Sequence, residues 1–198
     1  MKRILMLVGD FSEDYEVMVP FQALKAMGHD VTAVCPGKRK GELIATVVHD
    51  FGDFMSYTES FGHRFALNGD FHEERSRDHD GLLIPGGRAA EYLRLNPDVI
   101  ELVERHWSRG AVTSAICHGV QLLTATTVLN GRRATAYPAC KSEVLRSGAT
   151  WVDTAADAIC VDGTLITAPG WLAHPALLGT FNAALAERPV ASGEACHA

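Results

Sequence analysis

The stretch GAVTSAICHGVQLLTATTVL, residues 110–129, decides how the rest of the chain is interpreted. Its apolar run at 111–116 is typical of a buried strand, and apolar residues then recur at helical spacing over 120–128. Cys117 lies between the two patterns and is followed closely by Gly119. A cysteine at a sharp strand-to-helix turn has the layout of a nucleophile elbow with sulfur in place of oxygen. Because the N-terminus of a helix stabilises a thiolate and an oxyanion, this stretch predicts an active site built on Cys117.

Strands and helices alternate along most of the chain. Buried strands are predicted at 3–8, 30–34, 81–84, 111–116, 132–136, 150–152, 158–161 and 165–167. Helices are predicted at 88–94, 97–108, 141–147 and 173–186. An earlier helix has Ser12 as a plausible N-cap and stops near Gly28; Pro20 predicts a start or kink there, with 12–18 as an irregular lead-in. This order predicts an α/β sandwich with a mostly parallel sheet and ligands at the carboxyl ends of its strands.

The segment 38–78 interrupts this alternation. It has poor periodicity and scattered aromatic residues, and its apolar content is too low for a core of its own. We therefore expect an insertion within a single domain spanning 1–188, with short strands at 43–48 and 64–67 that pair as a hairpin. Residues 189–198 are expected to form a loose tail.

Composition excludes several classes of protein. The net charge of −6 argues against a nucleic-acid partner, and no apolar run reaches the roughly 18 residues of a membrane span. The five cysteines are scattered without a C-x-x-C pair, so neither a disulfide framework nor a zinc site is expected, and a cytoplasmic location fits. No dinucleotide fingerprint opens the first helix. We therefore expect no cofactor and no metal.

Two further segments are expected at the edge of the sheet where Cys117 lies. The Pro-Gly-Gly turn at 85–87 lets backbone N–H groups approach a ligand, and with the N–H of His118 it would form an oxyanion hole. Alone, it reads equally well as a plain tight turn. The acidic residues at 13–16 follow the first strand, and one of them could be a general acid or base, although such residues are more often solvated or capping.

The histidines are ambiguous at this stage. His118 could favour the thiolate as an imidazolium, but a sequence neighbour faces the sulfur of Cys117 only if the turn is strained. His174 heads the last helix, where a role without catalytic duty is the simpler reading. His63 lies in the insertion and could fold over the site. Surface loops are expected for His49, His72 and His79.

Three motifs together resemble the DJ-1/PfpI superfamily. EVMVP at 16–20 is similar to its glutamate-containing first loop, PGGRA at 85–89 to its glycine turn, and AICHG at 115–119 to its elbow. The likeness continues through GRRATAY at 131–137 and WVD at 151–153. Within the superfamily the chain most resembles the plant tandem-domain DJ-1 proteins, which are associated with glutathione-independent glyoxalase (glyoxalase III) activity, and it also resembles PfpI-like proteins.

The resemblance implies a flavodoxin-like three-layer sandwich in which Cys117 is the nucleophile, Glu16 its carboxylate partner and His118 the third member of the site. Gly86, Gly87 and His118 would bind the oxyanion. The implied reaction converts methylglyoxal to lactate, or glyoxal to glycolate, without a cofactor. The resemblance also implies a homodimer or higher homo-oligomer, because the plant proteins carry two such domains in one chain.

Other activities use the same parts. A PfpI-type cysteine amidase or peptidase needs the same thiolate and oxyanion hole, together with a histidine to protonate the leaving amine. In a redox-responsive chaperone, an accessible, low-pKa Cys117 would oxidise readily to the sulfinic level. Protein deglycation, also claimed for the superfamily, would follow from removal of free methylglyoxal. A glutaminase is disfavoured because His174-Pro175-Ala176 departs from the late His-Pro-Glu of that class.

Overall fold

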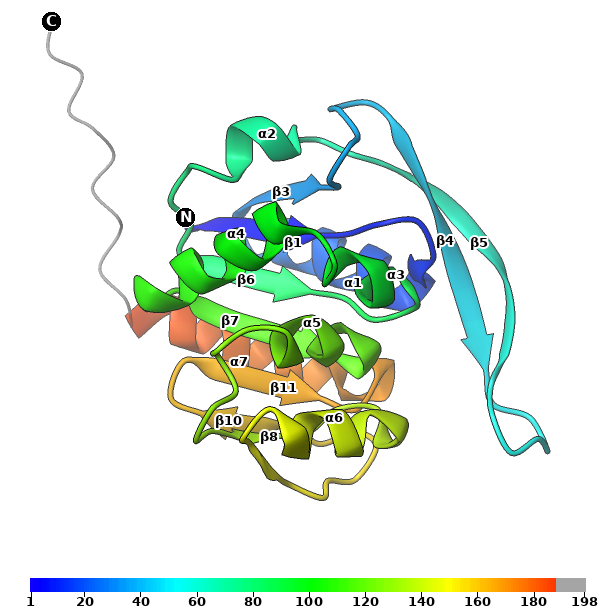
Figure 1. The fold of residues 1–198 in the computed structure, drawn as a ribbon. Helices are drawn as coiled ribbons and strands as arrows, with labels where there is room; N and C mark the ends of the chain where they lie inside the picture. The colour runs from blue at the N-terminus through cyan, green and yellow to red at the C-terminus, as the bar shows by residue number, and fades with distance from the viewer. Residues whose placement is uncertain (188–198) are drawn as a thin grey trace, which may run out of the picture.

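A six-stranded sheet forms the middle layer of the protein, in the order β10-β11-β7-β6-β1-β3 (Figure 1). Its strands are β1 (Arg3–Leu7), β3 (Asp30–Val34), β6 (Gly81–Ile84), β7 (Val112–Ile116), β10 (Cys160–Asp162) and β11 (Leu165–Ala168). All neighbours run parallel except β10, which is antiparallel to β11. This computed structural model describes residues 1–187; the tail expected at 189–198 lies outside the described residues. The predicted mostly parallel α/β sandwich is confirmed.

Helices cover both faces of this sheet (Figure 1). One face carries α3 (Ala89–Leu93), α4 (Pro97–Ser108) and α5 (Val120–Thr124), and the other carries α1 (Asp14–Ala26) and α7 (His174–Glu187). Short elements complete the fold: α2 (Phe71–Glu74), η1 (Cys117–Gly119), β8 (Arg133–Ala134), η2 (Pro138–Cys140), α6 (Lys141–Arg146), β9 (Thr150–Trp151) and η3 (Trp171–Ala173). No helix within residues 1–187 is long and apolar enough to cross a bilayer.

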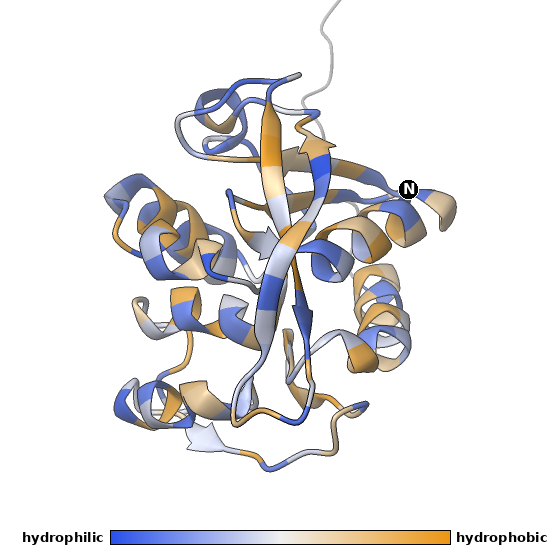
Figure 2. Cartoon of the chain, turned by 90° about the vertical axis from the view of Figure 1, so that its right-hand side faces the viewer, coloured by the Kyte–Doolittle hydropathy of each residue, from blue (hydrophilic) through white to orange (hydrophobic). Residues whose placement is uncertain are grey.

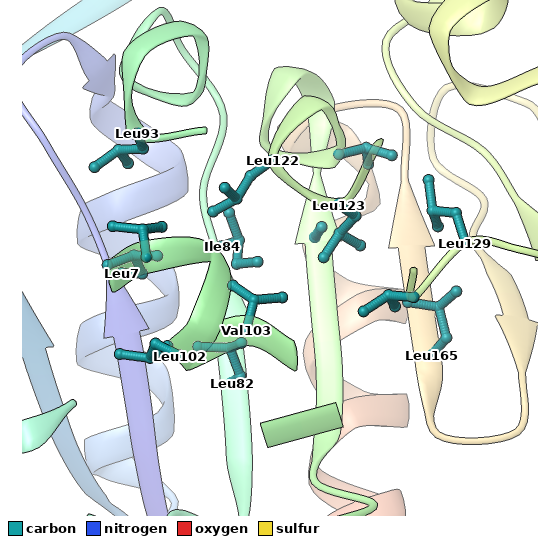
Figure 3. Packing of buried hydrophobic residues seen from close by; sticks show 14 of the residues in the cluster. Leu7, Leu82, Ile84, Leu93, Leu102, Val103, Leu122, Leu123, Leu129 and Leu165 are labelled. Carbon is teal, nitrogen blue, oxygen red and sulfur yellow. The ribbon is translucent and has the colours of Figure 1, made fainter. Parts of the chain in front are cut away.

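The core is divided between the two faces by the alternation of side chains along the strands. Leu5 and Leu7 of β1 join the cluster under α3, α4 and α5, in which Figure 3 labels Leu7. Ile4 and Met6 join the cluster under α1 and α7. A strand buried on both faces reads as a continuous apolar run, which is why the parallel strands were predictable. Each such side chain stabilises the fold by roughly 1.5–3 kcal/mol relative to an exposed one.

The first helix differs from its prediction. It begins at Asp14 and continues through Pro20, so the expected start at the proline and the irregular lead-in up to residue 18 are wrong. Glu13 caps the helix: its carboxylate accepts the N–H of Glu16 at 2.9 Å. Ser12 is not the cap; it lies in the short strand β2 (Ser12–Glu13), and its hydroxyl accepts the N–H of Gly9. The cap fixes the start of the helix, and the proline costs one internal hydrogen bond.

The segment 38–78 contains a long hairpin of β4 (Leu43–Asp50) and β5 (Thr58–Ala66), which forms a three-stranded sheet with β2. The hairpin stands beyond the carboxyl ends of the parallel strands (Figure 1), and turning the molecule shows it crossing that side (Figure 2). Ile44 and Phe65 are buried in the same cluster as Val17 of α1. The predicted hairpin exists, but its strands are longer than expected.

Candidate active site

Cys117 lies at the first residue after β7, where the backbone turns sharply into η1 and α5. Its φ of +57° is in the left-handed region, which a non-glycine residue rarely adopts and which is often found at functional sites. Gly119 makes the turn possible, because a Cβ there would lie 2.5 Å from the carbonyl oxygen of Ile84 and 2.6 Å from that of Pro85. The strand-turn-helix arrangement of an elbow is therefore present.

Glu16 reaches Cys117 from the first turn of α1. Its side chain is fully buried, and Oε2 accepts the N–H of Gly86 at 2.7 Å. The Cys117 side chain lies beside the carboxyl and favours its ionised form, while Oε1 has no hydrogen-bond partner among the described residues. Burial, and then the neighbouring Glu13, raise the pKa of Glu16 well above its usual value. The carboxyl group of Glu16 is therefore positioned to hold or release a proton beside the sulfur.

The glycine turn packs directly against these two groups. A Cβ at Gly86 would lie 2.5 Å from Glu16 Oε2 and 2.7 Å from Cys117 Cβ, so only glycine fits. The N–H of Gly86 donates to Glu16 Oε2, so its expected role as an oxyanion donor would require the carboxyl to move. Gly87 follows with a φ of +80°, a conformation that favours glycine. Its N–H and that of His118 are the remaining donors of the expected oxyanion hole.

The thiol of Cys117 is not the accessible, low-pKa group that the sequence predicts. Its residue is 4% exposed, and burial together with the Glu16 carboxyl raises the pKa of the thiol, although the N–H of His118 acts in the opposite direction. Two acids in contact within a buried site do not both ionise. The Glu16–Cys117 pair therefore carries at most one negative charge.

His118 does face the sulfur, because the turn has the strained geometry that this requires. Its Nδ1 lies 3.3 Å from Cys117 Sγ, and its ring stacks on Tyr137 with centroids 4.7 Å apart. Burial lowers the pKa of His118 to about 4, so the imidazole is neutral at neutral pH and does not act as the imidazolium considered from the sequence. A neutral imidazole can accept the proton of the thiol.

The two other candidate histidines lie elsewhere. The side chain of His63, on β5, is 80% exposed, and its Nδ1 is 3.2 Å from Oδ2 of Asp14. His174 is buried at the start of α7; burial lowers its pKa to about 4, and its Nε2 has no partner among residues 1–187. Neither lines the cavity beside Cys117. In the described part of the chain, no group of three or more His, Cys, Asp or Glu side chains could hold a metal.

Two of the histidines expected at the surface are buried instead. His49 of β4 lies 3.0 Å from Glu59 and packs its ring 4.4 Å from that of Tyr57. Tyr57 in turn packs edge-on against His118, at 5.7 Å. His79 is also buried, far along the chain, where its Nδ1 lies 3.1 Å from His106. The prediction of a surface loop for His49 failed because β4, which contains His49, extends further than the apolar pattern of its sequence.

An apolar cavity of about 270 Å³ opens beside the sulfur. Its wall includes Cys117, Phe51, Tyr137, Thr154, Trp171 and Leu172. No charged side chain of the described residues lines it. Sequence analysis missed this wall, because its aromatic residues come from separate segments with no shared motif.

Comparisons with known proteins extend over nearly the whole chain. The model of the DJ-1/PfpI family matches residues 2–184. Protein DJ-1 homolog D of Arabidopsis thaliana is 47% identical over 185 residues, which cover 93% of this chain and 48% of that protein. A protein of Pyrococcus abyssi named as a deglycase is 34% identical, over 83% of this chain and 88% of its own. The chain thus spans about half the length of the plant relatives that it matches.

The fold of the chain also matches that of solved structures. The crystal structure of Drosophila melanogaster DJ-1beta superposes with a TM-score of 0.79 at 21% identity, covering 94% of this chain and 91% of that one. At this identity the likeness supports the fold alone. The family match and the sequence relatives show that the chain belongs to the DJ-1/PfpI family.

Proposed function

We propose that this protein is a glutathione-independent glyoxalase, which converts small 2-oxoaldehydes to 2-hydroxy acids through a covalent adduct on Cys117. The observation that carries the proposal is the contact of one sulfur with two proton carriers. The Glu16 carboxyl lies beside Cys117, and Nδ1 of His118 lies 3.3 Å from the sulfur. A reaction that only moves protons after thiol addition needs these groups and no oxidant or reductant.

The first step is addition of the thiol to the aldehyde carbon. A carbon–sulfur bond forms, and the carbonyl π electrons move to oxygen, which is held by the N–H groups of Gly87 and His118. The thiol proton passes through Nδ1 of His118 to this oxygen and gives a neutral hemithioacetal. The lowered pKa of His118 suits a transient carrier, since the imidazolium does not retain the proton.

The second step is a proton shift between two carbons. Once sulfur is bonded to carbon it bears no charge, so Glu16 can ionise without a second anion beside it. Its carboxylate removes the hydrogen of the sulfur-bearing carbon as a proton while the neighbouring carbonyl oxygen takes up a proton, which gives an enediol. Glu16 then returns a proton to the neighbouring carbon as the hydroxyl on the sulfur-bearing carbon loses its own. The raised pKa of Glu16 makes its carboxylate a stronger base than an exposed one. The product is a thioester of the hydroxy acid.

The last step is hydrolysis of the thioester. Water adds to the carbonyl carbon, the carbon–sulfur bond breaks, and a proton returns to Cys117 as lactate or glycolate leaves. Methylglyoxal and deuterium oxide test the sequence of steps. Solvent deuterium at C2 of the product would support the enediol route over a direct hydride shift, and full turnover by Cys117→Ala would end the proposal.

A second candidate is hydrolysis of an amide or removal of a glycation adduct. The position of His118 favours it, because an imidazole near Sγ can protonate a leaving amine. The archaeal relatives named as deglycases point the same way. A panel of peptides, amides and glycated amines, run beside methylglyoxal on wild type and Cys117→Ala, separates the two. Cleavage of an amide faster than turnover of the oxoaldehyde would favour this candidate.

A further inference from the structure

The wall of the cavity beside Cys117 is built from aromatic side chains of three segments. Phe51 follows β4 at the tip of the hairpin and stacks on Trp171 of η3, with ring centroids 5.3 Å apart and planes 23° apart. The same ring lies 6.3 Å from Tyr137, with the planes 24° apart. Stacked and edge-on rings at such distances are the arrangement in which aromatic groups attract each other.

The wall has a defined position relative to the proposed reaction. Cys117 contributes to the cavity, whereas Glu16 and Gly86 pack on the sulfur without lining it. An aldehyde carbon bonded to the sulfur would therefore adjoin the cavity as well as the Glu16 carboxyl. The substituent of the carbonyl substrate is the part that extends into the cavity.

The size and polarity of the cavity indicate which substituents it suits. Its volume of about 270 Å³ is near the lower end of the range for drug-sized ligands, roughly 300–1,000 Å³, and far exceeds what the methyl group of methylglyoxal fills. Its lining includes Trp171, Leu172 and two prolines but, among the described residues, no charged group. A charged substituent would lose its water there without gaining a partner.

We propose that Phe51, Tyr137 and Trp171 form a subsite for an apolar, aromatic substituent, so that aryl 2-oxoaldehydes are better substrates than methylglyoxal. This inference rests on the proposed function, since it assigns the substrate class of the same site. It adds a specificity-determining role for Phe51, a residue on the surface hairpin that takes no part in the proton transfers. Stacking and burial of a phenyl ring against this wall supply the preference.

The test compares phenylglyoxal with methylglyoxal in wild type, Phe51→Ala and the matched control Phe54→Ala. Both phenylalanines are exposed and lie between β4 and β5, 59% and 72% respectively, but only Phe51 lines the cavity. We expect the ratio of kcat/KM for phenylglyoxal over methylglyoxal to fall about tenfold in Phe51→Ala and to change less than about twofold in Phe54→Ala. A 4-carboxyphenylglyoxal should be at least about tenfold poorer than phenylglyoxal in wild type.

The outcomes separate this inference from the proposed function. If methylglyoxal is turned over but the ratio is equal in all three proteins, the subsite is refuted and the glyoxalase proposal stands. If wild type turns over neither oxoaldehyde, the glyoxalase proposal fails, and titration calorimetry with unreactive acetophenone decides on the subsite. A dissociation constant about tenfold higher in Phe51→Ala alone supports it; absent or equal binding in the three proteins overturns it.

Discussion

Gly86→Ala is the most direct perturbation of the site, because a single methyl group would meet both reacting side chains. The added Cβ would lie 2.5 Å from Glu16 Oε2 and 2.7 Å from Cys117 Cβ. Ordinary contact begins at 3.4 Å, so the carboxyl must retreat by about 0.9 Å and the elbow must shift by about 0.7 Å. Either movement disturbs the 2.7 Å hydrogen bond from the N–H of Gly86 to Glu16.

Two magnitudes follow for Gly86→Ala. Overpacking of a buried site costs about 1–3 kcal/mol, which in a domain of this size lowers the melting temperature by about 2–12 °C. A displacement of about 1 Å at the reacting groups costs about 100-fold in turnover. The assays are thermal unfolding followed by circular dichroism and kcat with methylglyoxal at a temperature where both proteins are folded.

Gly179→Ala is the matched control. Gly179 lies within α7, and a Cβ there meets nothing within 4 Å. Alanine in a helix interior should stabilise the protein by about 0.5–1 kcal/mol and leave turnover unchanged. Wild-type turnover and an unchanged melting temperature in Gly86→Ala would refute the packing argument, because the methyl group would then have found room that the structure does not contain.

Three more predictions concern buried titratable groups. Glu16→Gln retains an oxygen for the N–H of Gly86 but no base, so kcat with methylglyoxal should fall about 10²–10⁴-fold while the circular dichroism spectrum is unchanged; a loss below tenfold would contradict a role in proton transfer. Burial raises the pKa of Glu13 from 4.5 to about 7, so its contribution to folding is present below pH 4.5 and is lost as the pH rises through 7. The unfolding free energy of wild type minus that of Glu13→Gln should therefore fall by about 3 kcal/mol between pH 4.5 and 7. A difference that stays constant with pH would count against this prediction. Burial lowers the pKa of His174 from 6.5 to about 4, so as the pH falls below 6.5 the unfolded chain takes up a proton at this residue before the folded protein does. In denaturant titrations, His174→Leu should therefore lose less stability than wild type between pH 6.5 and 4, and it should keep its turnover. Parallel pH profiles of stability in the two proteins would disprove this.

Sequence analysis predicted the middle layer of the fold well because burial leaves a simple pattern in parallel strands. The runs at 3–8 and 81–84 are apolar at nearly every position, and β1 and β6 lie within them. It failed where a side chain determines the local structure. Pro20 suggested a break, but the cap at Glu13 had already fixed the helix. The length of β5 was missed because most of its residues are exposed.

The candidate site was predictable to different degrees. Cys117 follows from one continuous stretch, because strand, turn and helix are consecutive. Spacing did not separate Glu16 from its acidic neighbours; the resemblance to a family did, and in the structure Glu16 is the acid that contacts the sulfur. His118 faces Sγ because its neighbour Cys117 has a strained φ, and no pattern of residues in the sequence encodes that angle. The aromatic wall depends on tertiary packing alone.

The position of Phe51 on an exposed hairpin separates two properties that many enzymes must change together. The groups proposed for the chemistry are buried, so substitutions there disturb the core. Phe51 and Leu172 are each 59% exposed, and exchanges at such positions usually alter stability by less than about 0.5 kcal/mol. Substitutions in the loop between β4 and β5 could therefore give relatives of this chain new substrates. A library restricted to residues 51–57 would reach the same variation in the laboratory, with the catalytic machinery left intact.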